Sequence, residues 1–404
     1  MLIHNLNSLS QLVFEVTDAC NLKCKYCAFS DLYTGYDERK NKYLSFGQAK
    51  KIIDYLVNFW KENSSDDFPK RLNIGFYGGE PLLNFKLIKE VIAYLESLGD
   101  FGRTLSYSMT TNGTLLDKYI DYLVEKKFNL LVSLDGDESA QGFRVYHNGC
   151  NSFGDVYDNV CMVREKYPAY FDQHVSFNSV LHSKNNIGRV YEFFQSNFSK
   201  TPRISPLSDS GVNQQTTEEF ENICNDYAQD FNRLTDATAE KIANTNFQLS
   251  PKLNRFHRSF EMESGNIYAD FHELVFNKCR SGYYPTGTCL PFSKKMYITV
   301  NGKIMQCERI DHEHFFGRIT DKGIELDFDK ITEDHNENMF KYITQCEGCA
   351  TKRRCPVCIY RVDDFYHTPD CADFTPGSKR KLELELLREN PHILEKVYQI
   401  KTVQ

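Results

Sequence analysis

The sequence predicts an α/β protein in which six βα units surround a parallel sheet and a smaller cysteine-rich module follows. The first observation is that short β-rich runs alternate with helical stretches from residue 11 to about residue 207, the pattern of repeated βα units. The second is that several of these runs are apolar on both faces, as strands covered by helices require. The third is a rise in cysteine density from residue 279 onward.

The expected elements of the first part follow from these runs. The six expected strands are Leu12–Val16, Leu72–Tyr77, Leu105–Thr111, Leu130–Asp135, Val175–Leu181 and Arg203–Pro206. The helices expected between them cover residues 46–62, 84–98, 115–127, 155–167 and 186–198. In barrels built from such units the functional groups lie at the C-terminal ends of the strands, so we expect the site at that rim.

Composition excludes several classes of function. Lys and Arg total 48 against 55 for Asp and Glu, a net charge of −7, which leaves no broad basic surface for a phosphate backbone and makes nucleic acid a poor candidate substrate. No run of about 18 or more apolar residues is present, and no basic segment with a long apolar stretch opens the chain. We expect a cytoplasmic protein without a membrane segment. Its 14 cysteines favour metal or redox use over disulfides.

Three cysteines lie within eight residues directly after the first expected strand. They are Cys20, Cys24 and Cys27. Thiolates are the ligands that iron–sulfur clusters select, and three of them leave one iron of a four-iron cluster open for a substrate. A zinc knuckle is one alternative, but no further Cys or His follows within the next turn to complete it. Stray core cysteines are another.

Other polar motifs follow later strands at the same expected rim. The second strand leads into Gly78-Gly79-Glu80-Pro81, where two glycines free the backbone for close approach to a ligand. The third ends in Thr110-Thr111-Asn112-Gly113, and the fourth carries Ser133 and Asp135. Each of these motifs is also compatible with an ordinary turn capped by small polar residues.

The C-terminal module carries eight cysteines, enough for two four-iron clusters. The Cys346-x2-Cys349 and Cys355-x2-Cys358 pairs, taken alone, are equally compatible with a zinc ribbon. Between the cysteine-rich segments, residues 297–304 predict a β-hairpin with an Asn-Gly turn.

The three-cysteine loop, with Tyr26 before its last cysteine, and the Gly-Gly-Glu turn together resemble the radical S-adenosylmethionine (radical SAM) superfamily. The resemblance implies a partial (β/α)6 barrel of TIM type, with SAM bound to the open iron of a 4Fe-4S cluster. It also implies a SAM contact for each of seven residues: Tyr26 along the adenine, Gly78, Gly79 and Glu80 at the ammonium, Ser133 and Asp135 near the ribose or methionine portion, and Arg144 at the methionine carboxylate.

The later cysteines resemble the SPASM extension of that superfamily, a small α+β domain with two auxiliary 4Fe-4S clusters, for three clusters in all. The resemblance assigns Cys279, Cys289, Cys307 and Cys358 to the first auxiliary cluster, and Cys346, Cys349, Cys355 and Cys371 to the second. The spacing departs from the family where Cys355 and Cys358 are separated by two residues instead of three. Cys279 lies outside the core motif, so three protein ligands and an open iron are an alternative for the first auxiliary cluster.

Glu308 directly follows Cys307, where the sulfatase-maturating branch of the family carries an Asp regarded as a base. A carboxylate beside a cluster can accept a proton from a substrate radical, so Glu308 is the candidate catalytic residue. The alternative is a salt bridge with Arg309 or another nearby cation.

The expected organisation has four parts. Residues 1–207 form the barrel, 208–278 a helical connector, 279–376 the SPASM domain and 377–404 a helical tail. The connector is either a surface bridge or a wall of the substrate site.

The resemblance implies an oxidoreductase that modifies peptides, and residues 78–84 resemble maturases of ribosomally made peptides. We therefore expect oxidative cross-linking of a peptide or protein substrate, a flavodoxin- or ferredoxin-type electron donor and, in the absence of a leader-binding domain before the first strand, a separate leader-binding protein as one option. The alternatives are an anaerobic sulfatase-maturating enzyme that forms formylglycine and a non-catalytic iron–sulfur binding protein.

Overall fold

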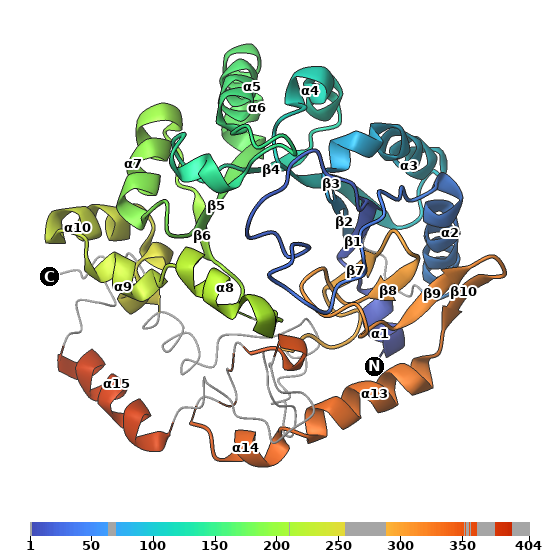
Figure 1. The fold of residues 1–404 in the computed structure, drawn as a ribbon. Coiled ribbons are helices and arrows are strands. Elements are labelled where there is room, and N and C mark those ends of the chain that lie inside the picture. Colours follow the sequence, from blue (N-terminus) through green and yellow to red (C-terminus); the bar gives the residue numbers. More distant parts are fainter. Residues whose placement is uncertain are drawn as a thin grey trace, which may run out of the picture.

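The computed structural model describes residues 2–63, 70–209, 211–254, 288–350, 352, 355, 357–361 and 376–389. Ten strands in this part form one sheet in the order β10-β9-β8-β7-β1-β2-β3-β4-β5-β6. Figure 1 shows β1 to β6 in an arc, with α2 to α7 along its outer side. The α/β fold with a partial barrel is thus confirmed.

The first six strands are parallel and run in chain order from β1 to β6. Their bounds are Gln11–Thr17 (β1), Lys70–Gly78 (β2), Arg103–Thr111 (β3), Asn129–Ser133 (β4), Val175–Leu181 (β5) and Arg203–Pro206 (β6). All six predicted strands are present, and the last two have the predicted bounds. The fourth ends at Ser133, two residues earlier than predicted, so Asp135 lies in the loop beyond it.

The helices of the barrel alternate with the strands. They are α1 (Leu2–Asn7), α2 (Phe46–Asn63), α3 (Phe85–Ser97), α4 (Leu116–Glu125), α5 (Phe153–Lys166), α6 (Pro168–His174) and α7 (Ile187–Phe198), with 3-10 turns η1 (Pro81–Asn84) and η2 (Ala140–Phe143). The five predicted helices are confirmed. A helix after residue 167 was not predicted; α6 begins at Pro168, because proline is well suited to the first turn of a helix.

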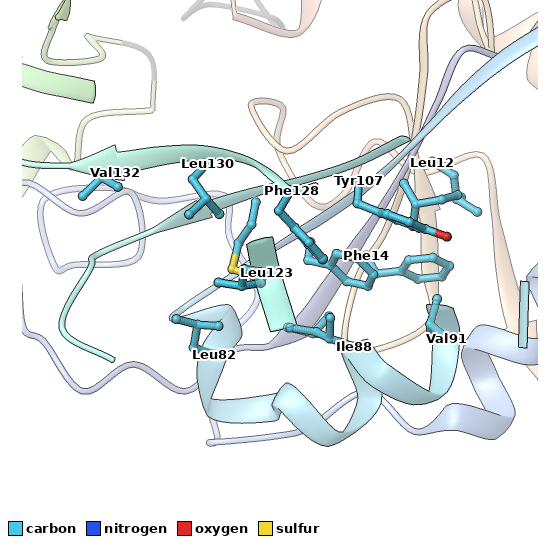
Figure 2. Close-up of a cluster of buried hydrophobic side chains, with 14 of the residues drawn as sticks. Leu12, Phe14, Leu82, Ile88, Val91, Tyr107, Leu123, Phe128, Leu130 and Val132 are labelled. Carbon is cyan, nitrogen blue, oxygen red and sulfur yellow. The ribbon is translucent and has the colours of Figure 1, made fainter. Parts of the chain in front are cut away.

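The core of the barrel lies between the strands and the outer helices. Successive residues of a strand face opposite sides, so Leu12 and Phe14 of β1 point to the helices. Figure 2 shows Phe14 and Phe128 packed over Ile88 of α3. Burial of such apolar side chains is the main stabilising contribution to the barrel. This packing fixes the positions of the strands and therefore of the loops at their ends.

The cysteine-rich part extends the same sheet. Its strands are β7 (Lys295–Ile298), β8 (Lys303–Met305), β9 (Gly317–Thr320) and β10 (Gly323–Leu326). The β7–β8 pair confirms the predicted hairpin, since Tyr297 pairs antiparallel with Met305. The sequence did not predict that β7 pairs parallel with β1. A carboxylate oxygen of Glu15 in β1 also accepts the backbone N–H of Val300 at 2.8 Å.

The remaining described helices lie in the connector and the C-terminal part. They are α8 (Thr217–Ile223), α9 (Tyr227–Asn232), α10 (Asp236–Thr245), α13 (Phe328–Phe340), α14 (Ile343–Glu347) and α15 (Gly377–Glu389), with η3 (Gln214–Thr216), η4 (Phe247–Leu249) and η6 (Ile359–Arg361). In the described part of the chain, no helix is long and apolar enough to cross a membrane. Cys279, Cys371 and the last part of the expected helical connector, residues 255–278, lie outside the described residues.

Candidate active site at the mouth of the barrel

The three-cysteine loop leaves the end of β1 and turns into the mouth of the barrel, where Figure 1 shows it in dark blue. Backbone hydrogen bonds fix it against the segment after η2. The N–H groups of Lys23 and Lys25 donate to the carbonyls of Val145 and Phe143 at 2.7 and 3.0 Å. The ring Nε2 of His147 lies 2.9 Å from the carbonyl oxygen of Cys20. These bonds hold the loop at the predicted rim.

The thiols of this loop lie in surroundings that fit an iron–sulfur cluster. Burial, together with the charge of Cys27, raises the pKa of Cys20 to about 11 and that of Cys24 to about 12. Thiolates gathered in a site of low polarity are unfavourable by themselves, and bound iron compensates their charge. Within the described residues, no group of three or more His, Cys, Asp or Glu side chains is arranged around a single metal ion.

The two glycines allow the end of β2 to lie against the start of this loop. The N–H of Gly79 donates to the carbonyl of Thr17 at 2.8 Å. A Cβ atom on Gly79 would lie 2.0 Å from the carbonyl oxygen of Ala19, and Gly78 has φ +133°. No other residue fits both positions without displacing the loop.

Glu80 fastens the ends of β2 and β3 together. Its buried carboxylate accepts the hydroxyl of Thr111 at 2.8 Å and the N–H groups of Asn112 and Leu82 at 2.7 and 3.1 Å. Burial raises the pKa of Glu80 to about 7, although these bonds oppose the rise. The contact of Glu80 with SAM remains a prediction, because the structure gives its carboxylate only these protein donors.

Asn112 connects this turn to the cysteine loop, a role that sequence reasoning missed. Its side-chain amide donates to the amide oxygen of Asn21 at 2.8 Å, and the Asn21 amide donates to the hydroxyl of Thr114 at the same distance. The amide nitrogen of Asn112 also lies 3.9 Å from the sulfur of Cys20. Its place directly after a strand was the available signal.

Asp135 is the centre of a buried charged cluster. Its carboxylate accepts the hydroxyl of Tyr26, the Nε–H of Arg144 at 3.0 Å and the N–H of Val180 at 2.9 Å, and it lies 3.4 Å from Nε2 of His182. Burial alone would raise the pKa of Asp135, but the Arg144 and His182 side chains outweigh it and hold the pKa below its usual value. The cluster joins the loops that follow β1, β4 and β5.

His182 is the member of this cluster that the sequence did not reveal. It follows β5 and is fully buried, and its ring stacks on Tyr26 with centroids 5.4 Å apart. Nothing in its local sequence distinguishes it from a core histidine. Ser133 is also buried, at the end of β4. The SAM contacts expected for Tyr26, Ser133, Asp135 and Arg144 are not tested by these positions.

A cavity of about 1120 Å³ occupies the interior of the barrel. It is lined from the first residues of the strands, such as Gln11 and Asn129, to residues near their ends, such as Tyr77 and Thr110. Glu308 also lines it, so the cavity extends from near the C-terminal ends of β2 and β3 to the residue that follows Cys307.

Three of the C-terminal cysteines lie on segments that the fold brings together. The amide of Gln306 donates to the carbonyl of Cys289, and the N–H of Ile359 donates to the hydroxyl of Thr288 at 3.0 Å. Burial raises the pKa of Cys307 to about 12, and the charge of Cys358 contributes to this rise. The assignment of Cys289, Cys307 and Cys358 to one cluster stays a prediction.

The second predicted ligand set is described only in part. Cys346 and Cys349 lie at α14, with the N–H of Cys349 donating to the carbonyl of Cys346 at 3.0 Å. The N–H of Val357 lies 3.4 Å from the sulfur of Cys355. The assignment of these cysteines and Cys371 to one cluster stays a prediction.

Glu308 forms an ion pair at the edge of the cavity. Its carboxylate lies 2.7 Å from Nζ of Lys295 and 3.9 Å from Nε of Arg309. The structure therefore places the candidate base in the cavity and gives it the cationic partners that the alternative interpretation requires.

Sequence comparisons agree with this site. The family model described as the radical SAM superfamily matches residues 14–196. A cysteine-type anaerobic sulfatase-maturating enzyme of Clostridium novyi is 21% identical over 350 residues, which is 85% of this chain and 86% of that enzyme. The radical SAM cyclopropyl synthase TigE of Paramaledivibacter caminithermalis is 23% identical over 317 residues, 76% of this chain.

The relatives differ in how much of their length is matched. The chain spans 58% of TigE and 45% of an uncharacterized protein of Methanocaldococcus jannaschii, with which it is 32% identical over 145 residues, 36% of this chain. Among solved structures, native anSMEcpe with bound AdoMet and Cp18Cys peptide has a TM-score of 0.61 and 17% identity, covering 97% of this chain and 99% of that one. That likeness establishes the fold.

The matched region contains the cysteine loop, the Gly78-Gly79 turn and the Asp135 cluster. The family implies SAM and a 4Fe-4S cluster as cofactors, and the donor set of the loop fits such a cluster. Residues 14–196 of this chain are therefore similar to the radical SAM superfamily.

Proposed function

We propose that this chain is a radical SAM maturase that oxidatively modifies a ribosomally made peptide, most specifically by cross-linking it. The observation that carries the proposal is the barrel cavity, which extends from Tyr77 and Thr110, near the C-terminal ends of β2 and β3, to Glu308 beside Cys307. A substrate side chain in this cavity would have the proposed SAM site beyond the strand ends on one side and Glu308, next to Cys307, on the other. That is the arrangement an oxidative radical reaction needs.

The radical chemistry belongs to the cofactors. When bound and reduced, the first cluster supplies an electron that splits SAM and yields a 5′-deoxyadenosyl radical able to remove a hydrogen atom from an unactivated C–H bond. The protein's part is to hold Cys20, Cys24 and Cys27 in place. The SAM site that we propose includes Arg144, whose Nε is taken by Asp135 while its two Nη groups have no hydrogen-bond partner among the described residues. An Arg with free Nη groups is well shaped for the methionine carboxylate.

Two auxiliary 4Fe-4S clusters, for three in all, are part of the proposal. Cys289, Cys307 and Cys358 would hold the first, with Cys279 as its fourth ligand or with an open iron. Oxidation of a substrate radical releases one electron and one proton. The auxiliary site would accept the electron, and Glu308 is the group beside it that can accept the proton.

Formation of formylglycine in a sulfatase is the second candidate. It is favoured by the Clostridium novyi relative, which matches over most of both chains. Glu308 in place of the family's Asp argues weakly against it. Incubating the loaded protein with a sulfatase-derived peptide, and separately with peptides encoded beside the gene, distinguishes the two by the mass of the product.

The first test is anaerobic reconstitution with iron counting, followed by dithionite, SAM and an assay for 5′-deoxyadenosine. We expect about twelve irons per chain, since each four-iron cluster contributes four, together with product. A fully loaded protein that leaves SAM intact in the presence of candidate peptides would favour a non-catalytic iron–sulfur protein. About four irons would mean that the C-terminal cysteines bind something else.

The proposal includes partners. A flavodoxin- or ferredoxin-type protein would reduce the first cluster, and a separate protein would bind a leader peptide if the substrate has one. The working compartment would be the reducing cytoplasm, because thiolate ligands must stay reduced to bind iron.

A further inference from the structure

The end of the barrel cavity that is opposite the mouth carries an excess of positive charge. Arg203 is the first residue of β6 and Lys295 is the first residue of β7, the two strands at the edges of the parallel part of the sheet. Both line the cavity, as do Glu308 and Arg309. We call these four residues the cavity floor.

The charges of the cavity floor do not balance. Lys295 and Arg309 lie on either side of one carboxylate, that of Glu308, at 2.7 and 3.9 Å. Arg203 is exposed, and its side chain has no ion pair or hydrogen bond within the described residues. Glu308 is the sole Asp or Glu among the described residues that line the cavity, so the floor carries three cations and one anion.

The rest of the lining offers no compensating charge. Ser108, Thr110, Asn129 and Ser176 line the walls with neutral polar groups. Arg203 is exposed and the side chain of Arg309 is 68% exposed, so water moderates their charge, but an unbalanced cluster of cations still attracts an anion. Arg and Lys both bind carboxylates, Arg through two parallel hydrogen bonds.

We infer that the cavity floor binds a carboxylate of the peptide substrate, so that the enzyme selects peptides with an acidic group next to the residue that reacts. This inference rests on the proposed function and adds to it the charge class of the substrate. The carboxylate comes from an Asp or Glu side chain or from the C-terminus of the peptide. Its binding at the floor leaves the neighbouring part of the peptide in the upper cavity, towards the mouth.

The test is affinity selection on the reconstituted protein with SAM bound. One pool contains short random peptides with acetylated and amidated ends, and a second pool has free C-termini. Retained peptides are identified by mass spectrometry. If a side chain supplies the carboxylate, we expect Asp and Glu to be enriched about tenfold in the first pool. A hydrogen bond between charged groups changes the affinity by about that factor. Retention confined to the second pool assigns the carboxylate to the C-terminus.

Variants distinguish binding at the cavity floor from nonspecific electrostatic attraction to the protein. Arg203→Gln and Lys295→Met should each reduce the enrichment about tenfold, whereas Arg203→Lys should keep most of it. Lys118→Met, at an exposed position of α4 outside the cavity, is the matched control and should retain the selectivity. Circular dichroism shows whether each variant is folded.

Three results overturn the inference: enrichment of neutral or basic peptides, no enrichment at all, or an acidic enrichment that survives in both Arg203→Gln and Lys295→Met. A wild-type protein that selects acidic peptides yet never cleaves SAM would refute the proposed function and leave the carboxylate site standing.

Discussion

The two cysteine regions are held in different ways. The loop with Cys20, Cys24 and Cys27 leaves a central strand of the barrel and is fixed by backbone bonds, by the Gly79 contact and by the Asp135 cluster. The segments with Cys289, Cys307 and Cys358 meet beyond the edge of the barrel. The contacts between them include two hydrogen bonds, those made by Gln306 and Ile359.

The two cysteine regions should therefore differ in how far they are folded before iron binds. A buried network joined by several hydrogen bonds keeps much of its geometry without a ligand, so the first loop is preorganised. A small cysteine-rich region gains much of its folding free energy from the metal it binds. We therefore expect the barrel to fold without iron and the C-terminal cysteine segments to depend on it.

The largest expected effect comes from removing one cysteine ligand from either region. Cys24→Ala should remove about four irons per chain and abolish production of 5′-deoxyadenosine, because SAM needs the open iron of that cluster. Cys307→Ala should also lose about four irons while it retains the iron of the first cluster. Iron counting and product assay measure both. Cys150→Ala, at an exposed thiol, is the control, and loss of iron from it would contradict the assignment.

The second effect tests preorganisation of the mouth. Asp135→Asn removes the charge that faces the buried Arg144 and should lower the free energy of unfolding of the iron-free protein by about 4 kcal/mol, since a buried cation loses its partner. Denaturation in urea measures it. Asp137→Asn breaks a half-exposed pair with Arg189 and should cost less than about 1 kcal/mol. Equal costs for the two variants would sink the argument.

The third effect concerns the contact between the two regions through Glu15. Burial raises the pKa of Glu15 from 4.5 to about 7. Between these two pH values the folded state therefore holds a proton on Glu15 that the unfolded state has lost. Stability should therefore fall as pH rises from about 5 to 7, by about 1.4 kcal/mol per pH unit for one such group. Glu80 has the same shift. Glu15→Gln should remove about half of the decline, and an unchanged pH profile of urea denaturation would falsify this account.

The smallest effect tests the connector at the mouth. Lys25 of the cysteine loop forms an ion pair with Glu219 of α8, with both side chains more than 40% exposed. Lys25→Ala should cost about 0.5 kcal/mol, because exposed pairs are screened by water. A change above about 2 kcal/mol would mean that α8 holds the loop far more firmly than an exposed ion pair can.

Much of the barrel could be predicted because its signals are local. The alternation of apolar residues, together with the glycines between elements, predicted the bounds of β5 and β6 and the positions of the helices. Asp135 was identified as a site residue, but its partners Arg144 and His182 lie 9 and 47 positions away. Arg144 was found through a family resemblance, whereas His182 lacked any motif and was missed.

The amino-acid sequence by itself determined the chemistry: the spacing of Cys20, Cys24 and Cys27, the glycines that let β2 approach the loop, and the eight later cysteines. Tertiary structure decided what these groups face. The parallel pairing of β7 with β1 brings Lys295 and Glu308 into the barrel cavity. A pairing between strands about 280 residues apart depends on packing of the whole sheet, and no local pattern encodes it.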